Sequence, residues 1–335
     1  MKRMKSYLTT TLKILFAAAI IYWLVTTGKV DFQVLYKLLD PKIAIVAFIL
    51  MGVNFWFTVE RWFLLLRSQA VTCTRMQAWK LGTIGVFFNF VVPGGVGGDV
   101  IKGYYIAKGN PQQRMKAVVT VAMDRLVGLY TMLLMAVSVM LWDWQAVAAH
   151  RELKAIFFFL LAVTAAFSVF WMMIFSRRLS SAEWIHSLLH FLPKGEHLWK
   201  MFSSFSSYAL SKKIIFQTVA LSFAAQIFVI LLFIHLGHAL GFDHVSAGTY
   251  FFVVPIGFMV TAIPIAPAGI GIGQAAFYYL FNLASGVESS IGATTITAMQ
   301  LIQFAFGLLG AWYYVAEAHA WKVQSGELQH SRNHE

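Results

Sequence analysis

Six stretches of this sequence are long and apolar enough to cross a lipid bilayer. A helix that spans the bilayer needs about 20 mostly apolar residues, and the stretches that reach this length lie at about residues 8–28, 41–66, 117–141, 154–175, 214–238 and 291–316. Within a bilayer every backbone polar group must find its partner inside the protein, which favours helices for such segments. The sequence therefore predicts an all-α integral membrane protein with about six transmembrane helices.

The composition agrees with that class and gives no sign of a soluble domain. The chain is 59% hydrophobic and 12% charged, whereas soluble domains average about 45–50% and about 25%. We expect a single polytopic membrane domain over residues 1–320 and a short cytoplasmic tail at 321–335. The net charge of +12 comes from short basic loops between apolar segments. We therefore expect contact with anionic lipid headgroups and no nucleic-acid partner.

Two further apolar regions are interrupted by glycine and proline. Region 81–108 breaks at Pro93–Asp99, and region 249–284 breaks at 264–273. Each region has two apolar arms, and each arm is too short to span a bilayer. This pattern predicts two re-entrant helical hairpins, each of which enters and leaves the membrane on one face.

The distribution of lysine and arginine sets the expected orientation. Basic residues cluster at the N-terminus and in segments 67–80, 102–116 and 176–213, whereas segment 239–284 contains none. Cytoplasmic loops are enriched in these residues. We therefore expect a bacterial inner-membrane protein with both termini in the cytoplasm, a first hairpin that opens to the cytoplasm and a second that opens outside.

This orientation makes two blocks of the chain equivalent but inverted. Residues 41–141 and residues 214–316 each comprise a span, a hairpin and a span, in opposite orientations. Such blocks are typical of inverted-topology repeats, whose broken segments meet near the middle of the membrane. The sequence therefore predicts an inverted repeat with both breaks close to the midplane.

The first break carries the strongest local motif. We predict that Asp99 is the N-cap of the helix that restarts after the break, and that the glycine backbone offers N–H groups to a phosphate. The alternative is structural, with Asp99 as a cap and the glycines allowing close packing. The candidate lipid-binding residues of this break are Asn89, Pro93, Gly94, Gly95, Gly97, Gly98, Asp99 and Lys102.

Two adjacent charges lie inside a predicted span. Arg125 is about 14 Å along the helix from Lys116, near the middle of the bilayer, where a charge costs several kcal/mol. We predict that Arg125 pairs with Asp99 or binds a lipid phosphate; the alternative is a permanent structural ion pair. Asp124 points about 100° away from Arg125 and cannot share its direction.

The second break follows the same logic without a charge. Its candidate lipid-binding residues are Pro267, Gly269, Gly271 and Gln274. Outside both breaks, Glu60 and Arg61 fall near the inner end of a predicted span. We expect these two side chains at the membrane interface.

Enzyme signatures are absent from the sequence. It contains no P-loop, no His-Glu-x-x-His and no Gly-x-Ser-x-Gly motif,. His235, His238 and His244 lack the spacing and the carboxylates of a zinc site. We expect a transporter rather than an enzyme, with no catalytic residues, no metal and no cofactor.

Three motifs, taken in chain order, resemble the lysylphosphatidylglycerol synthase transmembrane-region family, also called flippase-like. They are Pro93–Asp99 with Lys102, Asp124–Gly128, and Pro267–Gln274. The resemblance implies a membrane domain of the kind that translocates aminoacylated phosphatidylglycerol, with relatives in hopanoid, polyprenyl-glycan or cardiolipin pathways. The family often has glutamate near Gln274, and these residues include no aminoacyl-transfer domain, so we expect no lysylphosphatidylglycerol synthesis by this chain.

These expectations favour a flippase-like transporter that moves an anionic phospholipid or an isoprenoid lipid between leaflets. One alternative is a non-catalytic accessory or scaffold subunit that partners a lipid or glycan biosynthetic enzyme. Another is an intramembrane polyprenyl-phosphate transferase, which needs several acidic residues on one cytoplasmic face. The 14 acidic residues are mostly scattered through loops and tails, which disfavours the transferase.

Overall fold

The computed structural model describes most of the chain as helices. The described residues are 34–92, 96–175, 212–243, 245–263, 266–286 and 288–332, with isolated positions at 22, 26, 195, 196, 205 and 208; residues 34, 175, 212 and 317–332 are described by their backbone alone. The predicted span 8–28 therefore lies outside the described residues except for two positions. Pro93, Gly94 and Gly95 at the first break lie outside them as well.

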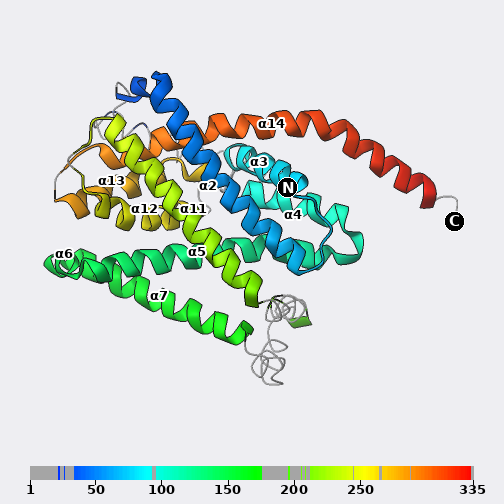
Figure 1. The fold of residues 1–335 in the computed structure, drawn as a ribbon, viewed down its shortest axis with the longest axis horizontal. Coiled ribbons are helices and arrows are strands. Elements are labelled where there is room, and N and C mark those ends of the chain that lie inside the picture. Colours follow the sequence, from blue (N-terminus) through cyan, green and yellow to red (C-terminus); the bar gives the residue numbers. More distant parts are fainter. Residues whose placement is uncertain are drawn as a thin grey trace, which may run out of the picture.

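Five helices of the described chain are long and apolar enough to cross a membrane (Figure 1). They confirm five of the predicted spans, and the protein is an all-α membrane protein. The last helix continues into the predicted tail and ends only at Arg332. The five helices are α2 (Pro41–Ser68), α5 (Arg114–Trp142), α7 (Arg151–Phe175), α11 (Lys212–Ala239) and α14 (Ile291–Arg332).

Two pairs of shorter helices form the predicted hairpins. The first pair is α3 (Arg75–Val91) with α4 (Gly97–Gly109), and the second is α12 (Ala247–Thr261) with α13 (Ile272–Ser285). In each pair the two arms pack against each other. With 13 to 17 residues, each arm is about 20–25 Å long, which is less than the hydrocarbon thickness of about 30 Å.

The first arm begins earlier than predicted. We expected it to start at residue 81, but α3 starts at Arg75 because Thr74 and Gln77 form a capping box, which satisfies free N–H groups at the helix start. Short elements complete the chain. They are η1 (Val34–Leu39), η2 (Pro111–Gln113), α6 (Trp144–Ala149) and η4 (Pro267–Gly269).

The leading helices of the two blocks, α2 and α11, lie side by side and run in opposite directions (Figure 1). Three hydrogen bonds fix their register. The bonded residues occur in increasing order along α2 and in decreasing order along α11, as expected of antiparallel helices. These bonds join His235 to the Ile43 carbonyl, Asn54 to the Ala225 carbonyl, and Arg61 to the Ser222 hydroxyl.

The remaining helices also form contacts between the two halves. Helix α14 of the second half packs on α3 of the first, and helix α5 of the first half packs on α12 of the second. Within each half the second hairpin arm packs on the closing helix, as α4 on α5 and α13 on α14. The reciprocal contacts and the antiparallel leading helices confirm the predicted inverted repeat.

Contacts along α14 show that the hairpins point toward each other. The middle of α13 lies beside the start of α14, both tips lie beside the middle of α14, and the middle of α3 lies beside its later turns. In that order, the contacts pair Gly292 with Phe277, Gln300 with Ala268, Phe304 with Phe90, Gly307 with Phe87 and Gly310 with Thr83.

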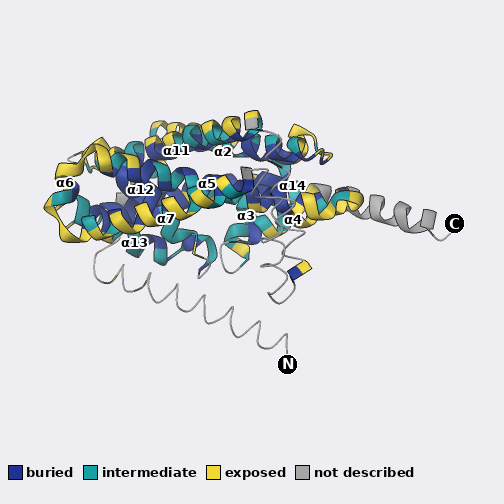
Figure 2. Cartoon of the chain, turned by 90° about the horizontal axis from the view of Figure 1, so that it is seen from below, coloured by how far each residue is buried: buried dark blue, intermediate teal, exposed yellow. Residues whose placement is uncertain are grey.

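Burial follows this arrangement (Figure 2). The faces of α2, α5 and α11 that meet in the interior are buried, whereas the outer face of α7 is largely exposed, as expected of a surface that meets lipid,. The interior of the second half is aromatic: Phe233 stacks on Phe277, with a centroid separation of 5.1 Å. The charged interior of the first half differs from it and forms the candidate site.

Candidate functional site

A buried ion pair joins α2 to α5 in the first half. Arg61 Nε lies 2.7 Å from Asp124 Oδ1, and the two side chains are only 8% and 5% exposed. Arg61 also donates through Nη1 to the hydroxyl of Ser222 on α11. Removing one partner of a buried ion pair leaves the other charge unpaired, which is strongly destabilising. These contacts of Arg61 therefore hold α2, α5 and α11 together.

The structure corrects the expectation for Arg61. We predicted an interfacial position for Glu60 and Arg61, but only Glu60 faces outward, where it pairs with Arg75. Arg61 points into the bundle instead, against Gly128 one turn after Asp124. A Cβ at Gly128 would lie 3.2 Å from Arg61 Nη1, so the glycine makes room for the guanidinium group. This packing explains the Asp124-Arg-Leu-Val-Gly128 pattern.

A second set of charges extends this pair toward α4. Lys102 Nζ lies 3.2 Å from Asp99 Oδ1 and 3.9 Å from Asp124 Oδ2, and it lies 5.1 Å from the centre of the Trp62 ring. Arg125 Nε pairs with Asp99 Oδ2. The predicted contact between Arg125 and Asp99 is therefore present, and Asp124 points to different partners, as expected.

These five side chains form one charged network, which we define as Arg61, Asp124, Lys102, Asp99 and Arg125. Cations and anions alternate along it, with three cations and two anions. Exposure rises along the second part, from 14% for Lys102 to 22% for Asp99 and 34% for Arg125. The network therefore has a buried end that is held by packing and a more accessible end at Arg125, with one positive charge in excess.

The role predicted for Asp99 as an N-cap is wrong. Helix α4 begins at Gly97 with Val96 as its N-cap, and Asp99 lies in the first turn. Asn89 of α3 takes the capping role, since its Oδ1 accepts a hydrogen bond of 2.8 Å from the Gly98 N–H. The side chain of Asp99 is consequently available to the two cations.

The glycines at the start of α4 allow the two arms to meet. A Cβ at Gly98 would lie 2.3 Å from the Gly85 carbonyl oxygen, and one at Gly97 would lie 2.5 Å from the Phe88 carbonyl oxygen. The Gly98 N–H is already bonded to Asn89. For these described residues the geometry supports the close-packing alternative.

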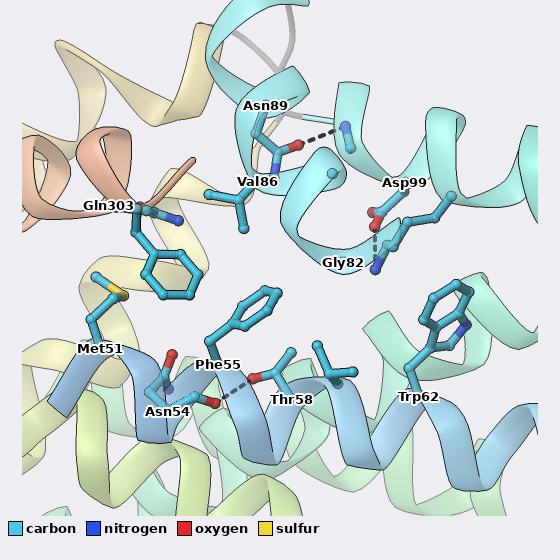
Figure 3. A pocket seen from close by; sticks show the side chains of 15 residues that line it. Met51, Asn54, Phe55, Thr58, Trp62, Gly82, Val86, Asn89, Asp99 and Gln303 are labelled. Carbon is cyan, nitrogen blue, oxygen red and sulfur yellow. Dashed lines mark hydrogen bonds and ion pairs between the residues drawn. The ribbon is translucent and has the colours of Figure 1, made fainter. Parts of the chain in front are cut away.

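A polar cavity of about 210 Å³ lies beside the network, between α2, α3, α4 and α14. Figure 3 shows Asp99 and Trp62 at one end, Met51 and Gln303 at the other, and Asn54 and Thr58 facing Asn89 across the space between. Among the described residues that line it, only Asp99 and Lys102 are charged. Amides and hydroxyls of this kind donate and accept hydrogen bonds.

A larger open groove of about 880 Å³ lies on the other side of Asp99, between α4 and α5. Its walls are mostly apolar, and Val100 and Tyr104 are 62% and 58% exposed along it. Its charged members are Asp99, Lys108, Arg114 and Arg125. Asp99 lines both spaces, so the accessible end of the network stands at the boundary between groove and cavity.

The second hairpin tip is polar but neutral. Gln274 Oε1 accepts a hydrogen bond of 2.7 Å from the Gly271 N–H, and its Nε2 donates to Gln300 and Thr297. Gln300 in turn donates to the carbonyl of Ala268 in the bent segment Pro267–Gly269. The predicted residues Gly269, Gly271 and Gln274 therefore support the turn and its attachment to α14.

The structure brings together Asn89, Gly97, Gly98, Asp99, Lys102, Asp124 and Arg125, and it keeps Gln274 with its neighbours in a separate neutral cluster. Sequence reasoning missed Arg61 and the cavity amide Gln303. The signal for Arg61 was present, because twenty residues of a mostly apolar helix precede it and five more apolar residues separate it from Arg67 near the end of that helix. No local pattern marked Gln303.

Comparison with known proteins gives one family assignment. A family model described as lysylphosphatidylglycerol synthase TM region matches residues 10–311. A search of curated proteins finds no match. The family model covers the first half-repeat, nearly all of the second and all of the charged network.

Proposed function

Because the chain belongs to the lysylphosphatidylglycerol synthase TM region family, we propose that it moves an anionic lipid between the two leaflets of its membrane. The headgroup would pass between the groove and the cavity, while the acyl chains stay along the apolar groove wall. The observation that carries this proposal is the ion pair between Arg125, which lines the groove, and Asp99, which lines both the groove and the cavity.

The charges of the network suit a lipid phosphate. Three cations face two carboxylates, so one monoanionic phosphate would neutralise the excess. A phosphate at Arg125 would compete with Asp99, which keeps Lys102 as its second partner. Charge-assisted hydrogen bonds between guanidinium and phosphate are strong and directional, so Arg125 can exchange one anion for the other without remaining unpaired.

The fold supports transport as the use of this site. Inverted repeats with broken helices near the midplane occur in transporters that expose one site alternately to each side. The proposal includes the expected location in a bacterial inner membrane, with both termini and the basic ends of α4 and α5 in the cytoplasm. Lys108 and Arg114 at the groove would then gather anionic lipid from the inner leaflet,.

Reconstitution into liposomes tests the proposal. Leaflet exchange of a fluorescent anionic phospholipid is measured for the wild-type protein, for Arg125→Gln and for Arg151→Gln, which removes an equal charge from an exposed site at the start of α7. We expect Arg125→Gln to slow exchange at least tenfold, roughly one charge-assisted contact, and Arg151→Gln to leave it unchanged.

Thermal unfolding of the same variants separates transport from structure. If Arg125→Gln lowers the melting temperature and exchange continues at the wild-type rate, the pair with Asp99 is structural and the proposed role of Arg125 is wrong. If no anionic or isoprenoid lipid exchanges with the wild-type protein, an accessory role beside a lipid or glycan biosynthetic enzyme becomes the better explanation.

A further inference from the structure

Asp99 holds a different cation with each of its two carboxylate oxygens. Its Oδ1 lies 3.2 Å from Lys102 Nζ, and its Oδ2 pairs with Arg125 Nε. Lys102 lines the cavity, Arg125 lines the groove, and Asp99 lines both spaces. The carboxylate therefore connects a cation on the cavity side to a cation on the groove side.

The buried pair of the network leaves these two cations to Asp99. Asp124 Oδ1 lies 2.7 Å from Arg61 Nε, whereas its Oδ2 lies 3.9 Å from Lys102 Nζ, beyond hydrogen-bonding distance,. Lys102 and Arg125 thus share the carboxylate of Asp99. A further anion can bind at either cation while Asp99 keeps the other.

The surroundings of Lys102 suit an anion in the cavity. Its ammonium group has three N–H donors, its side chain is only 14% exposed, and the Trp62 ring, 5.1 Å away, supports it from one side. The amides of Asn89 and Gln303 line the same cavity and can donate as well (Figure 3),. The volume of about 210 Å³ would hold several water molecules at about 30 Å³ each, which leaves room for a phosphate group.

We propose that Lys102 is a second phosphate-binding residue, on the cavity side, and that Asp99 transfers the lipid phosphate between Arg125 and Lys102 by exchanging partners with it. In one arrangement the phosphate binds Arg125 and Asp99 pairs with Lys102. In the other the phosphate binds Lys102 and Asp99 pairs with Arg125. Neither arrangement leaves a partly buried charge unpaired, which would be costly. This inference rests on the proposed function, because it assigns the path of the phosphate through the same site.

Asp99 is then a competitor of the phosphate as well as its carrier. Without this carboxylate, Arg125 and Lys102 could both hold one phosphate, so the lipid would bind more tightly and leave more slowly. A purely structural ion pair predicts the reverse, because its loss would loosen the site and weaken binding. The direction of the change in affinity therefore separates the two roles. The apolar wall of the groove commits the site to a lipid phosphate rather than to a soluble one.

The first test measures binding and transport of acyl-labelled phosphatidylglycerol by the full-length protein. Fluorescence anisotropy in detergent gives the Kd, and leaflet exchange in liposomes gives the rate. For Asp99→Asn we expect the Kd to fall at least about tenfold, the effect of about one charge-assisted hydrogen bond, and exchange to slow by a similar factor because release limits it. Asp243→Asn removes an equal charge from a side chain that is 78% exposed, and it should change neither quantity.

Lys102→Gln should change the affinity in the opposite direction. Asp99 then depends on Arg125 alone, so the phosphate must displace it without an alternative partner, and the Kd should rise at least about tenfold. The double variant Asp99→Asn with Lys102→Gln removes the competitor and the cavity-side residue together. We expect it to bind the lipid about as well as the wild-type protein, at Arg125, but to exchange it as slowly as Asp99→Asn.

The outcomes are distinguishable. Unchanged or weaker binding by folded Asp99→Asn overturns the inference, and exchange by the wild-type protein then leaves the proposed function in place. Exchange at the wild-type rate by the double variant overturns the role of Lys102. If thermal unfolding shows that Asp99→Asn does not fold, unchanged binding by Lys102→Gln overturns the inference instead.

Two further results bear on the lipid itself. Soluble glycerol 3-phosphate at the same concentration should not displace the labelled lipid, and displacement would overturn the choice of a lipid as the occupant. Absence of exchange of any anionic lipid by the wild-type protein overturns the proposed function and the inference together.

Discussion

The two hairpins have the same architecture but opposite chemistry. Residues 41–141 contain ten lysines and arginines, whereas 214–316 contain none. At the first tip, ionic contacts connect Asp99 to Lys102 and Arg125. At the second tip, Gln274 and Gln300 connect the turn to α14 through neutral hydrogen bonds.

The difference indicates how an inverted repeat can carry an asymmetric site. Both tips need polar contacts, because broken backbone at membrane depth must be satisfied within the protein. The second half meets that need with neutral amide and hydroxyl groups. The first half uses charges that have more than one possible partner, and in the proposed function its tip binds the anion while the second half serves as the support.

The largest effect is expected from breaking the buried end of the charged network. Asp124→Asn leaves the buried Arg61 without a carboxylate, while Lys102 keeps Asp99, and it should lower the free energy of unfolding by about 3–5 kcal/mol, as for other buried pairs. Thermal unfolding in detergent measures the loss. The double variant Arg61→Met with Asp124→Leu should recover most of it, and a double variant as unstable as Asp124→Asn would contradict this account.

A smaller effect is expected where the arms of each hairpin touch. In the first hairpin, Gly98→Ala would place its Cβ 2.3 Å from a backbone carbonyl oxygen of Gly85; in the second, Gly257→Ala would meet the side-chain ring of Phe277 at 2.4 Å. A backbone cannot move aside as easily as a ring, so Gly98→Ala should cost about 2–3 kcal/mol and Gly257→Ala about 1 kcal/mol less.

The matched control is Gly52→Ala in α2, where an added Cβ meets no atom within 4 Å. It should leave the protein as stable as before or stabilise it by up to about 1 kcal/mol through helix propensity. Thermal unfolding compares all three variants. Equal losses of unfolding free energy for Gly98→Ala and Gly257→Ala would contradict the proposed difference in packing between the two pairs of arms.

Removing the neutral network of the second tip should have a more modest effect. Gln274→Leu leaves the Gly271 N–H without its acceptor and Gln300 Oε1 without its donor, at a cost of about 1–2 kcal/mol in unfolding free energy. If the second half is only a support, lipid exchange per folded molecule should fall less than in Arg125→Gln. A larger fall in exchange for Gln274→Leu would place the second tip in the transport site itself.

The smallest effect concerns the reactivity of cysteines at the open ends of the hairpins, which a labelling experiment measures. Burial raises the pKa of the Cys73 thiol, in the loop before α3, to about 11. Only the thiolate reacts with maleimide, so labelling of Cys73 at pH 7 should be slow and should rise about tenfold per pH unit up to that pKa. The cysteine of Ala247→Cys in a Cys73→Ser background is exposed at the start of α12 and should react quickly.

An impermeant maleimide then reports which face each hairpin opens to. In intact cells it should label Ala247→Cys but not Met76→Cys, which lies at the exposed start of α3, until the membrane is opened. Labelling of both sites from outside would contradict the expected orientation of the two hairpins. Rapid labelling of Cys73 at pH 7 would contradict the raised pKa of its partly buried thiol.

The sequence alone determined the membrane class, five described spans, both hairpins and their inverted arrangement. These features are periodic or compositional: an apolar segment of about 20 residues and a glycine-proline break have the same consequence wherever they occur. The pairing of Arg125 with Asp99 was also predictable, since a charge at that depth needs a partner and few are present.

Only the tertiary structure decided which side chains share a site. Arg61, Lys102 and Gln303 come from three helices that are far apart in sequence, and their proximity depends on how α2, α4 and α14 pack. The capping role of Asn89 and the release of Asp99 to the cations follow from the close approach of two glycine-containing arms. Local sequence sets what each segment can be, whereas contacts between segments set which charges meet.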